Sequence, residues 1–105
     1  MNVMRRSFRR AGRLAPPTAR GLKARAVRLR PGGIMPWHST GNREELVIVL
    51  GGKVRFESRL NGSRIKAVTI QAGECVFVPS HTMHQVVNRS KASAEYLYVT
   101  APISG

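Results

Sequence analysis

Residues 46–60 read LVIVLGGKVRFESRL, and this stretch decides the fold. The apolar run Leu46–Leu50 has the length and composition of a strand that is buried on both faces. Gly51-Gly52 then supplies the two-residue turn of a tight hairpin. In Lys53–Leu60, apolar and charged residues alternate, which predicts a strand with one buried and one wet face. The stretch therefore predicts two antiparallel neighbours, one of them central to a sheet.

Further strands are predicted on both sides of this hairpin. Upstream, Lys23–Arg30 alternates basic and apolar residues until Pro31-Gly32-Gly33 ends the pattern. Downstream, four short segments carry strand patterns between turn sequences such as Asn61-Gly62: Arg64–Ile70, Cys75–Val78, His84–Asn88 and Glu95–Ala101. Short strands at such regular spacing are typical of a sandwich or barrel, and neither a helix nor an internal repeat is predicted. The sequence therefore predicts an all-β fold, either a sandwich or a barrel.

The charge of the chain divides it into two parts. Residues 1–30 carry ten Arg or Lys and no acid, whereas residues 31–105 carry eight bases and all five acids. Residues 1–21 are rich in Arg and poor in apolar side chains, so burial cannot offset the entropy of ordering them. We expect a flexible or loosely docked basic arm over residues 1–21 and a single domain of β-strands over residues 22–105. The arm's Arg-rich, acid-free composition is also that of a transit peptide.

Several partners and compartments are disfavoured by the sequence. The longest apolar run has five residues, whereas a membrane-spanning helix needs roughly 20. The lone Cys75 has no second cysteine with which to form an internal disulfide, which favours a reducing compartment, and we expect a cytoplasmic protein. Phe8 is the single aromatic residue of the basic segment 1–30, so we do not expect nucleic-acid recognition by base stacking.

Two histidines and an acid interrupt the strand pattern at points where chemistry is possible. His38 is predicted to lie in a loop before the buried strand, Glu44 leads into that strand, and His84 opens a later one. Two neutral imidazoles and one carboxylate form a ligand set that suits Fe(II), Mn(II), Ni(II) or Zn(II) and leaves positions open for substrate. These side chains meet only if the sheet closes. For each histidine alone, a surface or hydrogen-bonded role without metal is the competing interpretation.

The order of these residues resembles the two motifs of the cupin superfamily. The resemblance covers residues 22–101 and rests on ten positions in two groups: Gly32, His38, Thr40, Glu44 and Gly51, then Gly73, Pro79, His81, His84 and Asn88. Two positions depart from the family pattern. Thr40 stands where the first motif has a second histidine, and His81 stands where the second motif has glycine.

The resemblance implies a single small antiparallel β-barrel of the jelly-roll type and a metal centre. In cupins the metal is bound by the two histidines and the glutamate of the first motif and by the histidine of the second. His38, Glu44 and His84 fill three of these places, and Thr40 fills the fourth with a hydroxyl, which is a poor ligand for a transition metal. His81 is the candidate catalytic residue, as a general base or a substitute ligand, although a turn residue without chemistry is the alternative. A metal-free pocket is the competing interpretation of the whole site.

A second acid, Glu45, directly follows Glu44. Because successive side chains of a strand point to opposite faces, we expect Glu45 to point outward, toward Arg43 or a partner subunit. The alternative is that Glu45 is the true ligand.

Other side chains are candidates to line a pocket. Met35, Trp37, Thr40 and Met83 lie close in sequence to the proposed ligands and are expected to wall an apolar site, with core packing as the alternative. Tyr96 and Tyr98 share one face of the last predicted strand, which lines either the barrel or a subunit contact.

Two functions of different class follow from this site. One is a small metal-dependent enzyme, such as a dioxygenase or an isomerase, that acts on a small molecule in the barrel mouth. The other is a ligand-binding or sensory module without catalysis and without metal. In both cases we expect a homodimer, because a barrel this short gains buried surface by pairing.

Overall fold

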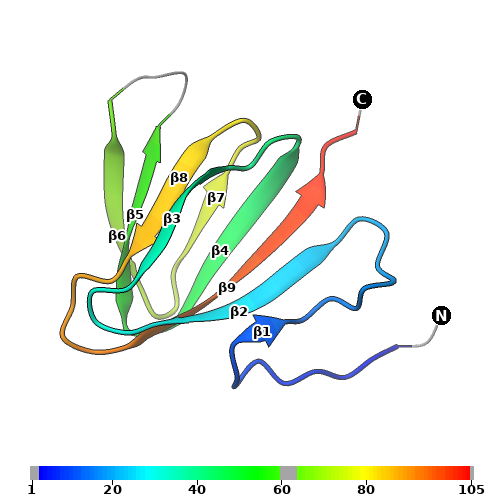
Figure 1. Ribbon diagram of the computed structural model, residues 1–105, viewed down its shortest axis with the longest axis horizontal. Helices are drawn as coiled ribbons and strands as arrows, with labels where there is room; N and C mark the ends of the chain where they lie inside the picture. The colour runs from blue at the N-terminus through cyan, green and yellow to red at the C-terminus, as the bar shows by residue number, and fades with distance from the viewer. Residues whose placement is uncertain (1–2, 60–63, 105) are drawn as a thin grey trace.

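The protein folds as two antiparallel sheets that face each other (Figure 1). The computed structural model describes residues 3–59 and 64–104, in which we find nine strands and no helix. One sheet has the order β1-β2-β9-β4-β7 and the other the order β3-β8-β5-β6. The strands are β1 (Gly12–Arg13), β2 (Lys23–Leu29), β3 (Ile34–Ser39), β4 (Arg43–Gly51), β5 (Lys53–Arg59), β6 (Lys66–Gln71), β7 (Cys75–Val78), β8 (Met83–Val87) and β9 (Ala94–Pro102). The predicted all-β antiparallel fold is confirmed as a two-layered jelly-roll sandwich.

The core lies between the two sheets and is built from alternate residues of each strand. Val47 and Val49 of β4 are each 1% exposed and pack with Val54 and Phe56 of β5. On each strand the inward-pointing residues are two positions apart, because successive side chains of a pleated strand point to opposite faces. Since the described part of the chain contains no helix, it also contains no helical segment suited to cross a membrane.

The turn between β4 and β5 requires glycine at one position. Gly52 has a φ of +69°, and a Cβ built on it would lie 2.7 Å from the backbone oxygen of Ser93. Any other residue here would have to displace backbone and adopt a left-handed conformation. The predicted turn at Gly51-Gly52 is therefore present, but the expectation that it joins a hairpin is wrong. β4 pairs with β7 and β9 and β5 pairs with β6 and β8, so this turn carries the chain from one sheet to the other. The second predicted hairpin, at Asn61-Gly62, lies outside the described residues.

The strand that contains His38 was not predicted from the sequence. Residues Ile34–Ser39, which include His38, form β3 and pair with β8, so the expectation that His38 lies in a loop is wrong. Pro31-Gly32-Gly33 before this segment is typical of a turn. Pro36 within the segment argues against a strand, because proline cannot donate a hydrogen bond to a neighbouring strand. β3 lies at the edge of its sheet, where proline is tolerated.

Part of the basic arm lies along the edge of the five-stranded sheet. β1 pairs with β2, with Gly12 opposite Ala26 and Arg13 opposite Arg25. The amide of Leu14 extends this pairing by donating to the carbonyl oxygen of Ala24 at 2.8 Å. Farther along, the Arg43 guanidinium donates to the carbonyl oxygen of Gly21.

Large apolar side chains remain exposed on the outside of the five-stranded sheet. Leu46 and Leu50 of β4 and Phe77 of β7 are 37%, 38% and 59% exposed. Leu46 and Phe77 are direct cross-strand partners, so their side chains lie together on the outer surface. We refer to these three residues as the outer apolar face.

Candidate metal centre

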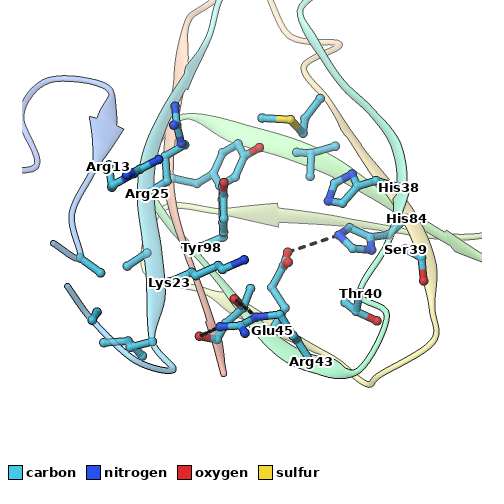
Figure 2. A pocket seen from close by; sticks show the side chains of 18 of the residues that line it. Arg13, Lys23, Arg25, His38, Ser39, Thr40, Arg43, Glu45, His84 and Tyr98 are labelled. Atoms are coloured by element: carbon cyan, nitrogen blue, oxygen red, sulfur yellow. Dashed lines mark hydrogen bonds and ion pairs between the residues drawn. The ribbon is translucent and has the colours of Figure 1, made fainter. Parts of the chain in front are cut away.

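Three side chains from three strands converge at one end of the sandwich. His38 comes from β3, Glu45 from β4 and His84 from β8, and one ligand atom of each lies within 4.8 Å of the others. Figure 2 shows the two imidazoles on one side of a cavity with the Glu45 carboxylate facing His84. The oxygen Oε2 of Glu45 lies 3.3 Å from Nε2 of His84. His84 is completely buried and Glu45 is 7% exposed, whereas His38 is exposed, so solvent reaches the group from the side of His38.

A β-bulge turns His38 toward this group. Met35 is paired with Val86 and His38 with His84, so three residues of β3 advance against two of β8. In a regular strand Met35 and His38 would point to opposite faces, because they are three positions apart. The extra residue of the bulge places both on the same face. As direct cross-strand partners, the two histidines have ring centroids 4.1 Å apart.

Backbone carbonyl groups fix the orientation of both imidazoles. Nδ1 of His38 lies 2.8 Å from the carbonyl oxygen of Pro36, and Nδ1 of His84 lies 3.1 Å from that of Thr82. Because a carbonyl oxygen can only accept, each Nδ1 carries a hydrogen, and in the neutral imidazole the lone pair then lies on Nε2. The Nε2 atom of His84 is buried without a hydrogen-bond partner in the described structure. This arrangement is the one that metal-binding histidines adopt, with the second ring nitrogen tied to a backbone or carboxylate acceptor.

Glu45, not Glu44, provides the carboxylate. Glu44 is exposed and lies on the outer side of β4, so the expectation that it faces the histidines is wrong. Glu45 shares the inward parity of Val47 and Val49, and the expectation that it points outward is also wrong. The alternative interpretation of the sequence, that Glu45 is the acid of the site, agrees with the geometry.

A cavity of about 450 Å³ adjoins the two histidines and Glu45. Tyr96 and Tyr98 of β9 both line it, so their shared face belongs to the interior of the sandwich and not to a subunit contact. The hydroxyl of Tyr96 is buried without a hydrogen-bond partner in the described structure. Burial, with a smaller contribution from the nearby Glu45 carboxylate, raises the pKa of Tyr96 well above its usual value. Tyr96 therefore stays a neutral hydroxyl that can donate to a bound molecule.

The comparison with family models decides the classification. The model described as the cupin domain matches residues 25–100, which include His38, Glu45 and His84. The chain belongs to the cupin family. No curated protein sequence matches this cupin significantly.

Solved structures share the fold of this cupin. A cupin 2 conserved barrel domain protein from Salinispora arenicola CNS-205 is 26% identical, with a TM-score of 0.72, over 88% of this chain and 74% of that one. Recombinant oxalate oxidase in complex with glycolate is 24% identical, with a TM-score of 0.73, over 78% of this chain and 42% of that one. The Schizosaccharomyces pombe Cnp3 cupin domain is 16% identical, with a TM-score of 0.75, over 89% and 64% of the two chains. This cupin thus spans less than half of the oxalate oxidase chain.

The two positions at which this cupin departs from the family motifs have structural roles. The hydroxyl of Thr40 donates to the carbonyl oxygen of Pro79 at 2.7 Å and accepts from the amide of Thr82 at 3.0 Å. It joins two loops beside the cavity and has no hydrogen left to donate to a ligand. His81 is exposed, has a φ of +54° and does not line the cavity, so the structure does not bring it to the histidine pair.

The predicted pocket residues of this cupin divide into two groups. Met35 and Thr40 line the cavity, whereas Trp37 and Met83 do not. Met35 and Trp37 would share one face of a regular strand, but the bulge between them turns Trp37 to the other face. The ring centroid of Trp37 lies 5.9 Å from the guanidinium carbon of Arg59. Sequence reasoning missed the basic residues of the cavity wall, Arg13, Lys23, Arg25 and Arg43.

Proposed function

We propose that this cupin binds one divalent transition metal ion through Nε2 of His38, Nε2 of His84 and the carboxylate of Glu45. The observation that carries this proposal is the buried Nε2 atom of His84, which has no hydrogen-bond partner and faces a buried carboxylate. An unsatisfied polar atom in the interior costs about 1 to 3 kcal/mol. Coordination of an ion would remove this cost and neutralise the buried charge of Glu45.

The donor set fits such an ion in both geometry and chemistry. Metal–nitrogen and metal–oxygen bonds of about 2.1 Å leave neighbouring donor atoms about 3.0 to 3.5 Å apart. The Nε2 atom of His84 and Oε2 of Glu45 are 3.3 Å apart, and all three donor atoms lie within 4.8 Å of one another. Side-chain rotations of His38 and Glu45 would close the remaining gap. Imidazole and carboxylate ligands suit Fe(II), Mn(II), Ni(II) and Zn(II).

The bound ion would face a cavity large enough for a small molecule. Three protein ligands leave coordination positions open, at which an ion of this class polarises a substrate oxygen or activates dioxygen. Tyr96 lines the same cavity, and its buried hydroxyl, which has no partner in the described structure, would donate a hydrogen bond to an oxygen of a bound molecule that reaches it. We therefore propose a metal-dependent cupin that binds a small molecule and acts on it, as a dioxygenase or an isomerase would.

The metal content of purified protein tests this proposal. We expect about one equivalent of a transition metal in protein purified without chelators, and a large loss in a His38→Ala, His84→Ala double variant, because two of three ligands are gone. His81→Ala is the matched control, since this histidine is exposed and does not line the cavity. Near-zero metal in the parent, even after reconstitution with each candidate ion, would contradict the proposal and favour a metal-free binding module.

We also propose that two copies of the chain pair through the outer apolar face. Its three large side chains are exposed together, and β7, which carries one of them, is the end strand of its sheet. An exposed apolar surface beside an unpaired strand edge is a common site of association.

A further inference from the structure

The inner face of β2 changes from apolar to basic as the strand passes from the core to the cavity. Its inward residues are identified by their partners on β9: Val27 lies opposite Tyr96, Arg25 opposite Tyr98 and Lys23 opposite Thr100. Val27 packs against the core cluster, whereas Arg25 and Lys23 line the cavity. Two cations thus occupy positions on the inner face, where a strand that served packing alone would carry apolar side chains.

A second strand adds another cation directly beside Arg25. Arg13 of β1 is the cross-strand partner of Arg25, and both side chains line the cavity. Directly opposed residues of an antiparallel pair have Cβ atoms about 5 Å apart, and like charges there are destabilising. Among the described residues, no acidic side chain forms an ion pair with either guanidinium. An anion bound between the two arginines would convert this repulsion into attraction.

The cavity wall as a whole carries an excess of positive charge opposite the proposed metal centre. Its lining includes four basic residues and one acid, Glu45. The Arg43 guanidinium is bonded to the side-chain and backbone oxygens of Thr100, which leaves the other three bases for a ligand. Figure 2 shows Arg13 and Arg25 on the side of the cavity away from the histidines, with Lys23 extending toward Glu45.

We propose that Arg13 and Arg25 form a clamp for a carboxylate group, and that the molecule bound in this cavity is a small organic acid with polar groups at both ends. This inference rests on the proposed function, because the far end of the acid would lie at the metal centre. Guanidinium groups bind carboxylates through paired, charge-assisted hydrogen bonds, and two guanidiniums side by side would hold one carboxylate in a fixed orientation. Lys23 contributes a further positive charge between the clamp and Glu45.

One of the two clamp arginines, and Lys23 beside it, come from a segment outside the family match. The cupin model begins at residue 25, so Arg13 and Lys23 precede the matched region. Residues 15–17 and 19 of the arm also line the cavity. The basic arm is thereby assigned a role in ligand selection, as one wall of the binding site.

Calorimetric titration of metal-loaded protein at fixed ionic strength tests the clamp. The probes are succinate, its neutral diamide, and 3-phosphonopropionate, which has the same chain length as succinate. We expect succinate to bind and the diamide not to bind. Arg13→Gln and Arg25→Gln should each weaken succinate binding about tenfold or more, the loss of a charge-assisted hydrogen bond. The double variant should lose less than the product of the two single effects, because both arginines hold one group.

Arg28→Gln is the matched control, because Arg28 lies on the same strand but faces outward and pairs with Glu95 at 3.0 Å. Metal content measured on every variant separates this proposal from the metal site itself, since losing the clamp should leave it unchanged. Removing either arginine should also raise the melting temperature of ligand-free protein at low salt, by relieving like-charge repulsion. The proposal is overturned if no probe binds the parent, if the diamide binds as well as succinate, or if both clamp variants behave like Arg28→Gln. Binding of the phosphonate more than tenfold tighter than succinate would overturn the carboxylate assignment in favour of phosphate esters.

Discussion

Replacing each of the adjacent acids of β4 by its amide gives the sharpest test of the metal centre. Glu45→Gln removes the carboxylate that faces His84, whereas Glu44→Gln changes an exposed residue on the opposite face of the same strand. Both changes conserve shape, so the fold should be retained. Loss of groups that merely support metal ligands costs about 10- to 100-fold in affinity, and removing a direct ligand should cost about 100-fold or more. Glu44→Gln should leave the affinity unchanged.

Thermal unfolding with and without metal converts this difference into a large signal. At a metal concentration of about 100 times the dissociation constant, binding stabilises the parent by about 2.7 kcal/mol. For a domain of this size that corresponds to a rise in melting temperature of about 10 to 20 °C. A 100-fold weaker site gains about 0.4 kcal/mol at the same concentration, a rise of about 2 to 3 °C. If Glu45→Gln keeps the full metal-induced rise, or if Glu44→Gln loses it, the assignment of Glu45 is refuted.

Three further predictions concern stability and assembly. Hydrogen bonds from Arg55 and, to a smaller extent, from Gln85 lower the pKa of the Glu57 carboxyl group below its ordinary value of 4.5. Glu57→Gln should therefore be less stable than the parent above pH 4.5. In urea titrations this difference in stability should shrink as the pH falls through the lowered pKa, because the stabilisation requires an ionised carboxylate. Gly52→Ala should destabilise the protein by at least about 1 to 3 kcal/mol through its left-handed backbone and the close Ser93 oxygen, whereas equal melting temperatures for this variant and the parent would show that the turn adapts. Phe77→Lys should turn a dimer into a monomer in sedimentation equilibrium, and an unchanged mass would exclude the outer apolar face as the contact.

The fold could be predicted from sequence because its strongest signals are local. The alternation within Lys53–Arg59 and the turn at Gly51-Gly52 each act over a few residues, and the structure has both the strand and the turn. Whether that turn joins two strands of one sheet or crosses between sheets is not a local property, and here it crosses. β3 could not be predicted, since Pro36 argues against a strand unless the segment is known to lie at an edge. Edge position depends on the whole topology, which no local pattern reports.

The site was harder to predict because it depends on which face each side chain occupies. Leu46–Leu50 is apolar at every position, so the sequence does not indicate which alternate residues of the strand point inward. It therefore cannot decide whether Glu44 or Glu45 faces the interior. The motif spacing does not help, because Gly52 follows Glu45 at the same interval as Gly51 follows Glu44.

Bulges and registers limit the prediction in the same way. The bulge that turns His38 inward and Trp37 away becomes visible only in the pairing with β8. By contrast, the basic wall could have been predicted from the sequence. Arg25 and Lys23 lie at the same alternate positions of β2 as the apolar residues Leu29 and Val27, so they share the inner face of that strand.

The three converging side chains do not belong to one sheet. His38 and His84 lie on strands of the four-stranded sheet, whereas Glu45 lies on a strand of the five-stranded sheet. An ion held by all three would act as a crosslink between two layers that otherwise meet through side-chain packing. Removal of the ion should allow this end of the sandwich to open more often. When the metal is removed with a chelator, the amide hydrogens of β3 and of the first residues of β4 should therefore exchange faster, and those around Val47 in the core should change less.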